Sequence, residues 1–227
     1  MTITVVSGWD ATSDNLSQTP STGQAAGYIT GSAGIAWTAA QQAEYPGFVQ
    51  IDQSPDITAS DQLADIFDYE SGAVTLADLP TLITNARAGY YAGTRPGQRW
   101  PGVYCDQSNL TPVADALEAA GMTNVPIWLA DYNLTQAQAI SEIRDASGPY
   151  PIIGVQYNDA GAYDQDEFSQ DWLDTVSATP TAPPGQWNDP DEWTWAQVMI
   201  VGVGLDGTLY SFSYDVNTGD WSSASPE

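Results

Sequence analysis

The stretch DIFDYE, residues Asp65–Glu70, places two carboxylates two positions apart at the end of a short β-prone run. Residues two apart in a strand point the same way, so Asp68 and Glu70 are predicted to share one face. Neighbouring carboxylates repel each other, and one of them should therefore keep its proton to a higher pH. Glycoside hydrolysis needs such a pair, whereas solvated carboxylates at a strand end are the ordinary alternative for an isolated D-x-E.

Short apolar runs rich in β-forming residues recur on both sides of this stretch and alternate with helix-like segments. The alternation predicts βα units and a largely parallel sheet, so the expected fold class is α/β, an irregular TIM-like (β/α) barrel. The expected strands are Ile3–Trp9, Gly27–Thr30, Phe48–Asp52, Asp65–Glu70, Gly102–Cys105, Pro126–Asp131, Ile152–Tyr157 and a short strand near Tyr163–Phe168.

Three helices are expected between these strands. One begins at Thr111 and Pro112, a cap followed by a first-turn proline, and ends at Gly121. Its predicted inward stripe consists of Val113, Ala116, Leu117 and Ala120. The other two are expected at Asp78–Arg87, ending at Gly89, and at Thr135–Ala146.

The charge balance excludes several functions. The chain has 29 acidic and four basic residues, a net charge of -25, and no Lys or His. Binding to a nucleic-acid backbone needs clustered cations, so no nucleic-acid partner is expected. Histidine-based triads, Schiff-base lysines and histidine-containing zinc sites are excluded, and the single Cys cannot form an intrachain disulfide. Asp, Glu and Tyr remain for acid–base chemistry, and no metal or cofactor is expected.

The sequence contains no recognisable targeting segment. No run approaches the ~20 apolar residues of a membrane span, so no membrane partner is expected. The N-terminal MTITVVSGWD lacks the basic and long apolar regions of a signal peptide and is interpreted as a first strand. The expected location is extracellular or virion-associated, reached without a signal peptide.

The composition changes after residue 177. Residues 178–186 (ATPTAPPGQ) are expected to form a Pro-rich linker between a barrel at 1–177 and a small Trp-rich antiparallel β meander at 187–227. The meander strands are expected at Gln197–Gly204, Thr208–Tyr214 and Asp220–Ser222, and four Trp lie in it: Trp187, Trp193, Trp195 and Trp221. About 40 residues rarely sustain a core alone. Docking on the barrel, a homo-oligomer, or a partner in a virion or cell-surface assembly is therefore expected.

Polar and aromatic side chains recur at the other strand ends, where the active site of a parallel barrel lies. Mixtures of aromatic faces, carboxylates and amides bind sugars, although large aromatic residues taken singly also serve as core or rim packing. The candidate residues are Asp10, Asp52, Tyr104, Trp128, Asp131, Tyr132, Gln156, Tyr157 and Asp164.

The order of these motifs resembles family-25 glycoside hydrolases, which are N-acetylmuramidases. The resemblance covers residues 1–177, through Asp10, the D-x-E pair, W-x-A-x-Y at 128–132, Q-Y at 156–157 and D-x-x-x-F at 164–168. It is closest to the divergent barrels encoded by actinobacteria and their phages. It differs at Asp166, where Asn is typical, at D-A-T for D-V-S, and at VQY for W-Q-Y.

The resemblance implies an irregular barrel that cleaves N-acetylmuramic acid–N-acetylglucosamine linkages, with cell-wall peptidoglycan as its glycan partner. It implies that Glu70 is the general acid and that Asp68 stabilises or orients the attacking 2-acetamido group. It implies that Asp10 and Asp164 position the sugar.

Two other functions compete with this one. A catalytically weak or inactive glycan-binding or virion structural module on the same fold would suit the acidity and the Trp-rich tail. A calcium protein is a weaker alternative, because the clusters DQDEF and DPDEW lack EF-hand spacing.

Overall fold

The computed structural model describes residues 3–54, 63–70, 74–93, 95, 97–145, 148–159, 161–176, 197–203, 209–215, 220–221 and 225–226. The chain divides into two compact units, residues 1–180 and 181–227, and each is described by itself. Within the described part, no helix has the length and apolar character needed to cross a membrane.

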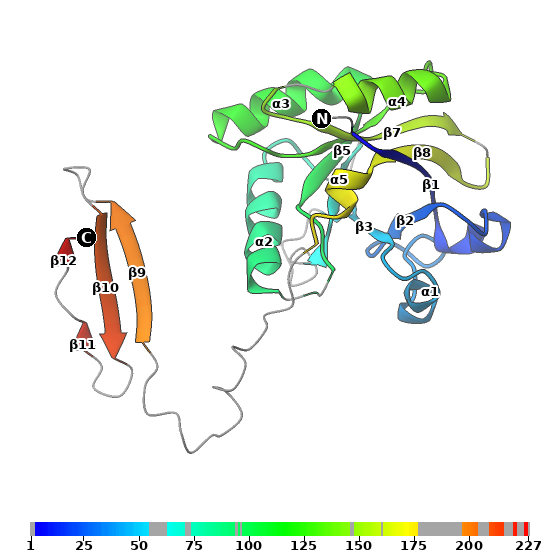
Figure 1. Ribbon diagram of the computed structural model, residues 1–227. Coiled ribbons are helices and arrows are strands. Elements are labelled where there is room, and N and C mark those ends of the chain that lie inside the picture. Colours follow the sequence, from blue (N-terminus) through cyan, green and yellow to red (C-terminus); the bar gives the residue numbers. More distant parts are fainter. Residues whose placement is uncertain are drawn as a thin grey trace. The chain divides into compact units, whose positions relative to one another are not determined.

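The first unit is a closed barrel of eight strands, which confirms the predicted barrel (Figure 1). Neighbours from β1 to β7 run parallel, and β8 is antiparallel to both β7 and β1, which it joins. The strands are β1 (Val5–Ala11), β2 (Gln24–Tyr28), β3 (Val49–Asp52), β4 (Ile66–Tyr69), β5 (Gly102–Asp106), β6 (Ile127–Ala130), β7 (Ile152–Asp159) and β8 (Asp164–Ser169).

In the part of the chain that the structure describes, the helices are fewer than one per strand, so the predicted TIM-like (β/α) alternation is not present there. β1 and β2 are connected through the 3-10 helix η1, and β7 connects to β8 across residues 160–163. A connection this short cannot hold a helical crossover, so β8 must return antiparallel. The helices are η1 (Ser13–Gln18), α1 (Ala39–Glu44), α2 (Leu79–Ala92), η3 (Gln107–Asn109), α3 (Leu110–Ala119), α4 (Gln136–Asp145) and α5 (Gln170–Leu173).

The helix predictions hold for α4 and for the C-terminal end of α3 and fail at one end of α2. α3 begins at Leu110 after Asn109, so Thr111 lies inside the helix and is not its cap. α3 ends before Gly121, which has φ 68° and donates its N–H to the carbonyl of Glu118 at 2.8 Å. Ala120, predicted to face inward, is exposed because it lies past the last helical turn. α2 continues through Gly89, the predicted stop, and ends at Gly93 in the left-handed conformation. Gly89 is buried, so core packing outweighs its low helix propensity.

Two layers of apolar side chains hold the barrel together. Alternate strand residues fill its interior, among them Ala26, Val49, Ile51, Ile66 and Phe168. The opposite strand faces pack under α2 and α3 through Phe67, Val103, Ile127, Leu82 and Leu117. One end of the interior is closed by Trp172 of α5, whose ring stacks on Phe168 with centroids 6.4 Å apart. This alternation places Asp68, two residues from Ile66, toward the interior.

The second unit is a small antiparallel sheet in which β10 pairs with β9, β11 and β12. Its strands are β9 (Gln197–Val203), β10 (Leu209–Asp215), β11 (Asp220–Trp221) and β12 (Ser225–Pro226). The first three lie within one residue of their predicted ranges, and β12 was not predicted. The predicted linker at 178–186 and Trp187, Trp193 and Trp195 lie outside the described residues.

Candidate active site

The two carboxylates of the D-x-E motif lie together at the carboxyl end of β4 but in different surroundings. The Asp68 side chain is 5% exposed and accepts a hydrogen bond from the Tyr28 hydroxyl at 3.2 Å. Glu70 follows the strand, is exposed, and has an Oε1 that lies 3.3 Å from the Tyr104 hydroxyl. The motif therefore supplies one buried and one accessible carboxylate to the same end of the barrel.

A hydrogen-bond network centred on Gln156 connects further predicted residues. Its Nε2 donates to Asp10 Oδ2 at 3.1 Å, and its Oε1 accepts from the Tyr132 hydroxyl at 3.2 Å. The Tyr104 hydroxyl also donates to Gln156 Oε1. Because Tyr104 contacts Glu70 as well, the network joins β1, β5 and β7 to the D-x-E motif.

The eighth strand adds two more carboxylates because it runs back beside β1. Asp164 pairs in register with Asp10, and Asp166 pairs with Gly8. Asp164 is partly exposed, whereas Asp166 is fully buried and accepts a hydrogen bond from the Trp128 indole at 3.1 Å. The sequence placed Asp166 at this strand end, as a departure from the family pattern, but Asp166 was not among the predicted site residues. Its spacing of two from Asp164 in a strand was the signal that would have found it.

A pocket of about 210 Å³ opens beside this network. Three carboxylates and three phenols line it together with small polar residues of the loops after β1 and β7. The lining includes Asp10, Thr12, Asn15, Tyr28, Tyr132, Asp159, Tyr163 and Asp164. Tyr28 connects the pocket to Asp68, because its ring lines the pocket while its hydroxyl binds that carboxylate. Carboxylates and aromatic faces in one hollow suit the hydroxyls and ring faces of a sugar.

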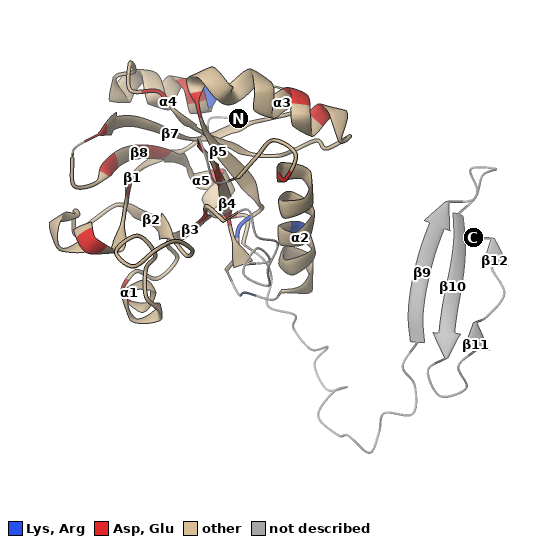
Figure 2. Ribbon diagram, turned by 180° about the vertical axis from the view of Figure 1, so that it is seen from behind, with Lys and Arg blue, Asp and Glu red and all other residues tan. Residues whose placement is uncertain are grey.

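The buried and partly buried carboxyl groups at this end of the barrel have no basic side chain beside them, so their pKa values are raised. Burial, and then the charge of Glu70, raise the pKa of Asp68 to about 7, against a smaller lowering by the Tyr28 hydrogen bond. Burial, followed by the charges of Asp159 and Glu70, raises the pKa of Asp164 to about 6. Burial also holds the pKa values of Asp10 and Asp166 well above their usual range. Basic positions are sparse on the barrel, as Figure 2 shows.

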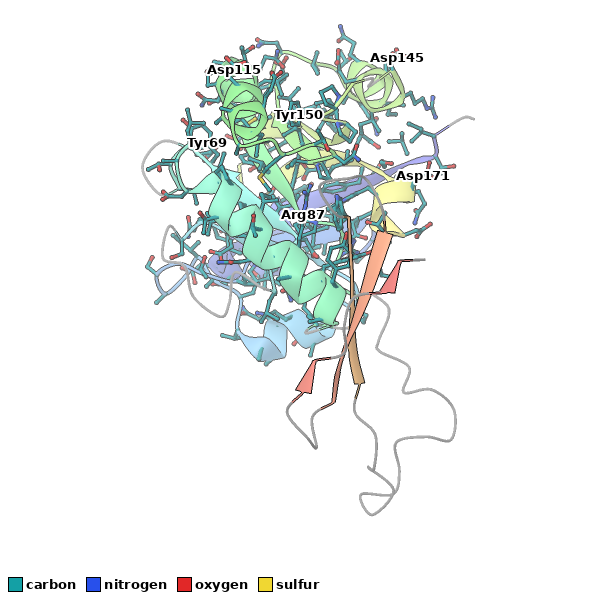
Figure 3. The ribbon with its side chains drawn as sticks, turned by 90° about the vertical axis from the view of Figure 1, so that its left-hand side faces the viewer. Tyr69, Arg87, Asp115, Asp145, Tyr150 and Asp171 are labelled. Atoms are coloured by element: carbon teal, nitrogen blue, oxygen red, sulfur yellow. The ribbon has the colours of Figure 1, made fainter. Side chains whose placement is uncertain are left out.

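All four arginines have partners away from the pocket. Arg95 and Arg99 pair with Asp65. Asp65 directly precedes β4 and does not line the pocket. Arg87, which is labelled on α2 in Figure 3, donates to the carbonyls of Thr123 and Asn124. Its guanidinium lies over the Trp100 ring, 4.6 Å from the ring centroid. Arg144 donates to the carbonyl of Ile3. Since the chain has no Lys or His, none of these carboxylates is neutralised by a basic residue of its own chain.

Of the predicted residues, Asp10, Tyr132 and Asp164 line the pocket, and Asp68, Glu70, Tyr104 and Gln156 adjoin it through hydrogen-bonded or neighbouring side chains. The other four take part in neither arrangement. Trp128 is 0% exposed, so it cannot contact a sugar, and instead holds Asp166 from inside the barrel. Tyr157 follows Gln156 and faces the other side of the wall, where it lines a separate hollow with Trp9. Asp131 accepts the N–H of Asn133 at 3.0 Å and so caps its own turn. Asp52 accepts from the Thr30 hydroxyl and the Ser54 N–H, because it faces away from the barrel interior beside Ile51.

Among the residues that the structure describes, no trio of carboxylate, thiol or imidazole groups is arranged to hold a metal ion. Comparisons with family models, curated proteins and solved structures give no match for this chain.

Proposed function

We propose that this chain is a glycoside hydrolase of the lysozyme type, on a divergent family-25-like TIM barrel, acting on bacterial cell-wall peptidoglycan. The observation that carries the proposal is the pair of carboxylates at one end of the barrel, one buried and one exposed. Burial raises the pKa of Asp68 to about 7, and Glu70 lies exposed two residues away. Hydrolysis of a glycosidic bond uses two carboxyl groups beside the same bond.

The roles follow from accessibility. Glu70 lies at the rim, where it can protonate the glycosidic oxygen that leaves. Asp68 lies deeper and is oriented by Tyr28, so that in its ionised form it accepts the N–H of a 2-acetamido group. The acetamido carbonyl oxygen then attacks the anomeric carbon as the bond to the leaving oxygen breaks. Asp10 and Asp164 line the pocket beside the pair and are proposed to bind sugar hydroxyls.

The arrangement of the barrel supports the family assignment. An irregular barrel of eight strands with fewer than eight helices is the fold that the resemblance implies, and the described strands and helices have that character. The net charge of -25 opposes an anionic cell wall, but screening over ~8 Å at physiological salt makes this a hindrance to encounter rather than a barrier.

The test is release of reducing sugar from purified peptidoglycan. Glu70→Gln should lower the rate at least ~10²-fold, the usual effect of losing a positioned acid. The matched control is Glu118→Gln, the same substitution at an exposed position on α3, which should be nearly silent. Equal release by wild type and Glu70→Gln would contradict the assignment. Glycan binding without turnover by the wild type would support the binding module instead.

A further inference from the structure

We propose that Asp166 is a positioning residue that carries one proton and donates it in a hydrogen bond to Asp10, so that Asp10 stays ionised and aligned at the pocket. This inference rests on the proposed hydrolase function for its activity test. Its central claim, a proton held on Asp166, can be measured without any activity.

The two carboxyl groups lie against each other inside the barrel. Asp10 is 6% exposed and Asp166 is 0% exposed, and their carboxyl groups lie within reach of each other. Two ionised carboxylates cannot form a hydrogen bond with each other, because each would only accept. A shared proton satisfies both groups and removes one of two buried negative charges.

The neutral donors around the pair leave one oxygen for this proton. Trp128 Nε1 donates to Asp166 Oδ1, and Gln156 Nε2 donates to Asp10 Oδ2. Asp166 Oδ2 is buried and has no hydrogen-bond partner among the described residues. A protonated Oδ2 explains why no donor faces it. The four arginines are engaged elsewhere, so no basic side chain of the chain replaces the proton.

The surroundings favour Asp166 as the residue that holds the proton. Asp166 is fully buried and its Oδ2 meets no donor among the described residues, whereas Asp10 lines the open pocket and accepts from Gln156, so the negative charge is better placed on Asp10. Burial raises the pKa values of both groups. The titratable and polar groups that face the pair from the other elements add no positive charge. They are Tyr28, Asp68, Glu70, Tyr104, Trp128, Tyr132, Gln156 and Asp164.

An ionised Asp10 determines which way the Gln156 amide points. The ionised carboxylate can only accept, so the NH₂ group of the Gln156 amide must point to Asp10. The amide oxygen of Gln156 then faces the hydroxyls of Tyr104 and Tyr132. Tyr104 lies between that oxygen and Glu70. The proton on Asp166 is thus connected through Asp10 and Gln156 to Tyr104, a chain of oriented hydrogen bonds. Tyr104 gives its one hydroxyl proton to Gln156, so its oxygen can accept from Glu70 when Glu70 carries the proton that it delivers.

The decisive variant is Asp166→Asn, which keeps an oxygen for Trp128 and offers an N–H to Asp10. We expect activity within about threefold of wild type, whereas Asp166→Ala, which lacks the donor, should lose ~10-fold or more in kcat. Rescue by the conservative variant separates hydrogen-bond donation from mere filling of space. Asp171→Asn on the exposed face of α5 is the folding control.

Infrared difference spectroscopy tests the proton directly. At about pH 8, above the pKa of about 7 of Asp68, wild type minus Asp166→Asn should show the carbonyl band of a protonated carboxyl group. A carboxylate band in its place would overturn the proposal, as would an Asp166→Asn variant as inactive as Asp166→Ala. If the wild type cleaves no glycan, the proposed function fails while the spectrum still decides whether Asp166 holds the proton.

Discussion

At the scale of single residues, the pair in DIFDYE shows that two acids only two positions apart can lie in different surroundings. Asp68 ends up beneath Tyr28 with a pKa of about 7, and Glu70 lies exposed at the rim. The resemblance to family-25 enzymes assigns the acid role to Glu70, and burial raises the pKa of Asp68. Under the proposed function, the pH dependence of the rate therefore reports the protonation of Asp68.

If Asp68 must be ionised to accept the acetamido N–H, kcat/KM should rise with pH through about 7, because the free enzyme loses its inhibitory proton there. Asp68→Asn should lose at least ~10²-fold in rate and should also lose this limb of the profile. Initial rates on peptidoglycan between about pH 5 and 9 measure it. A profile that instead falls through about pH 7 would make Asp68 the general acid and reverse the roles.

Asp65, the first residue of the motif, is predicted to be structural. It is fully buried and accepts the backbone N–H groups of Arg99 at 2.6 Å and Gln50 at 2.9 Å. It also pairs with the guanidinium groups of Arg95 and Arg99. Asp65→Ala leaves these buried donors without an acceptor. The free energy of unfolding, measured by urea denaturation, should therefore fall by about 3–5 kcal/mol. Asp115→Ala, at the exposed outer side of α3 (Figure 3), should change little.

At the scale of elements, the C-terminal end of α3 depends on one backbone conformation. Gly121 has φ 68°, its Cβ position faces open space, and the N–H of Met122 returns to the carbonyl of Leu117 at 2.9 Å. Gly121→Ala should cost about 1 kcal/mol of unfolding free energy through the strained φ alone. Gly121→Asn should cost less, because Asn tolerates this conformation, and an equal cost for both would contradict the explanation.

At the scale of the whole molecule, the barrel should lose stability as the pH rises. Asp164 and Asp68 have folded pKa values of about 6 and about 7, above the ~3.9 of an unfolded Asp, so the folded state binds more protons in between. This contribution is complete below about pH 4 and is lost as the pH rises through about 6 and 7. Repulsion within a chain of net charge -25 acts in the same direction.

Urea unfolding at several pH values between about 5 and 8 measures this dependence. The free energy of unfolding should fall steadily across that range, and Asp68→Asn should flatten the part near pH 7. Stability that increases over the same range would show that these carboxyl groups are not protonated in the folded state.

The sequence by itself determined the order of strands, the barrel and the candidates at the strand ends. Local patterns carry this information: β-prone runs mark β1 to β8, Gly121 ends α3, and spacing of two puts Asp68 and Glu70 at one end of β4. The same patterns misplaced the end of α2 at Gly89, because burial of that residue depends on what packs against it.

Only the tertiary structure decided which candidates meet. Asp10 and Gln156 are 146 positions apart and touch because the barrel closes through an antiparallel β8. That closure buries Trp128 and Asp166 inside the wall and turns Tyr157 to its outer side. It also divides the D-x-E pair into a buried and an exposed carboxylate. Burial and proton affinity depend on neighbours from distant strands, so no local pattern of residues contains them.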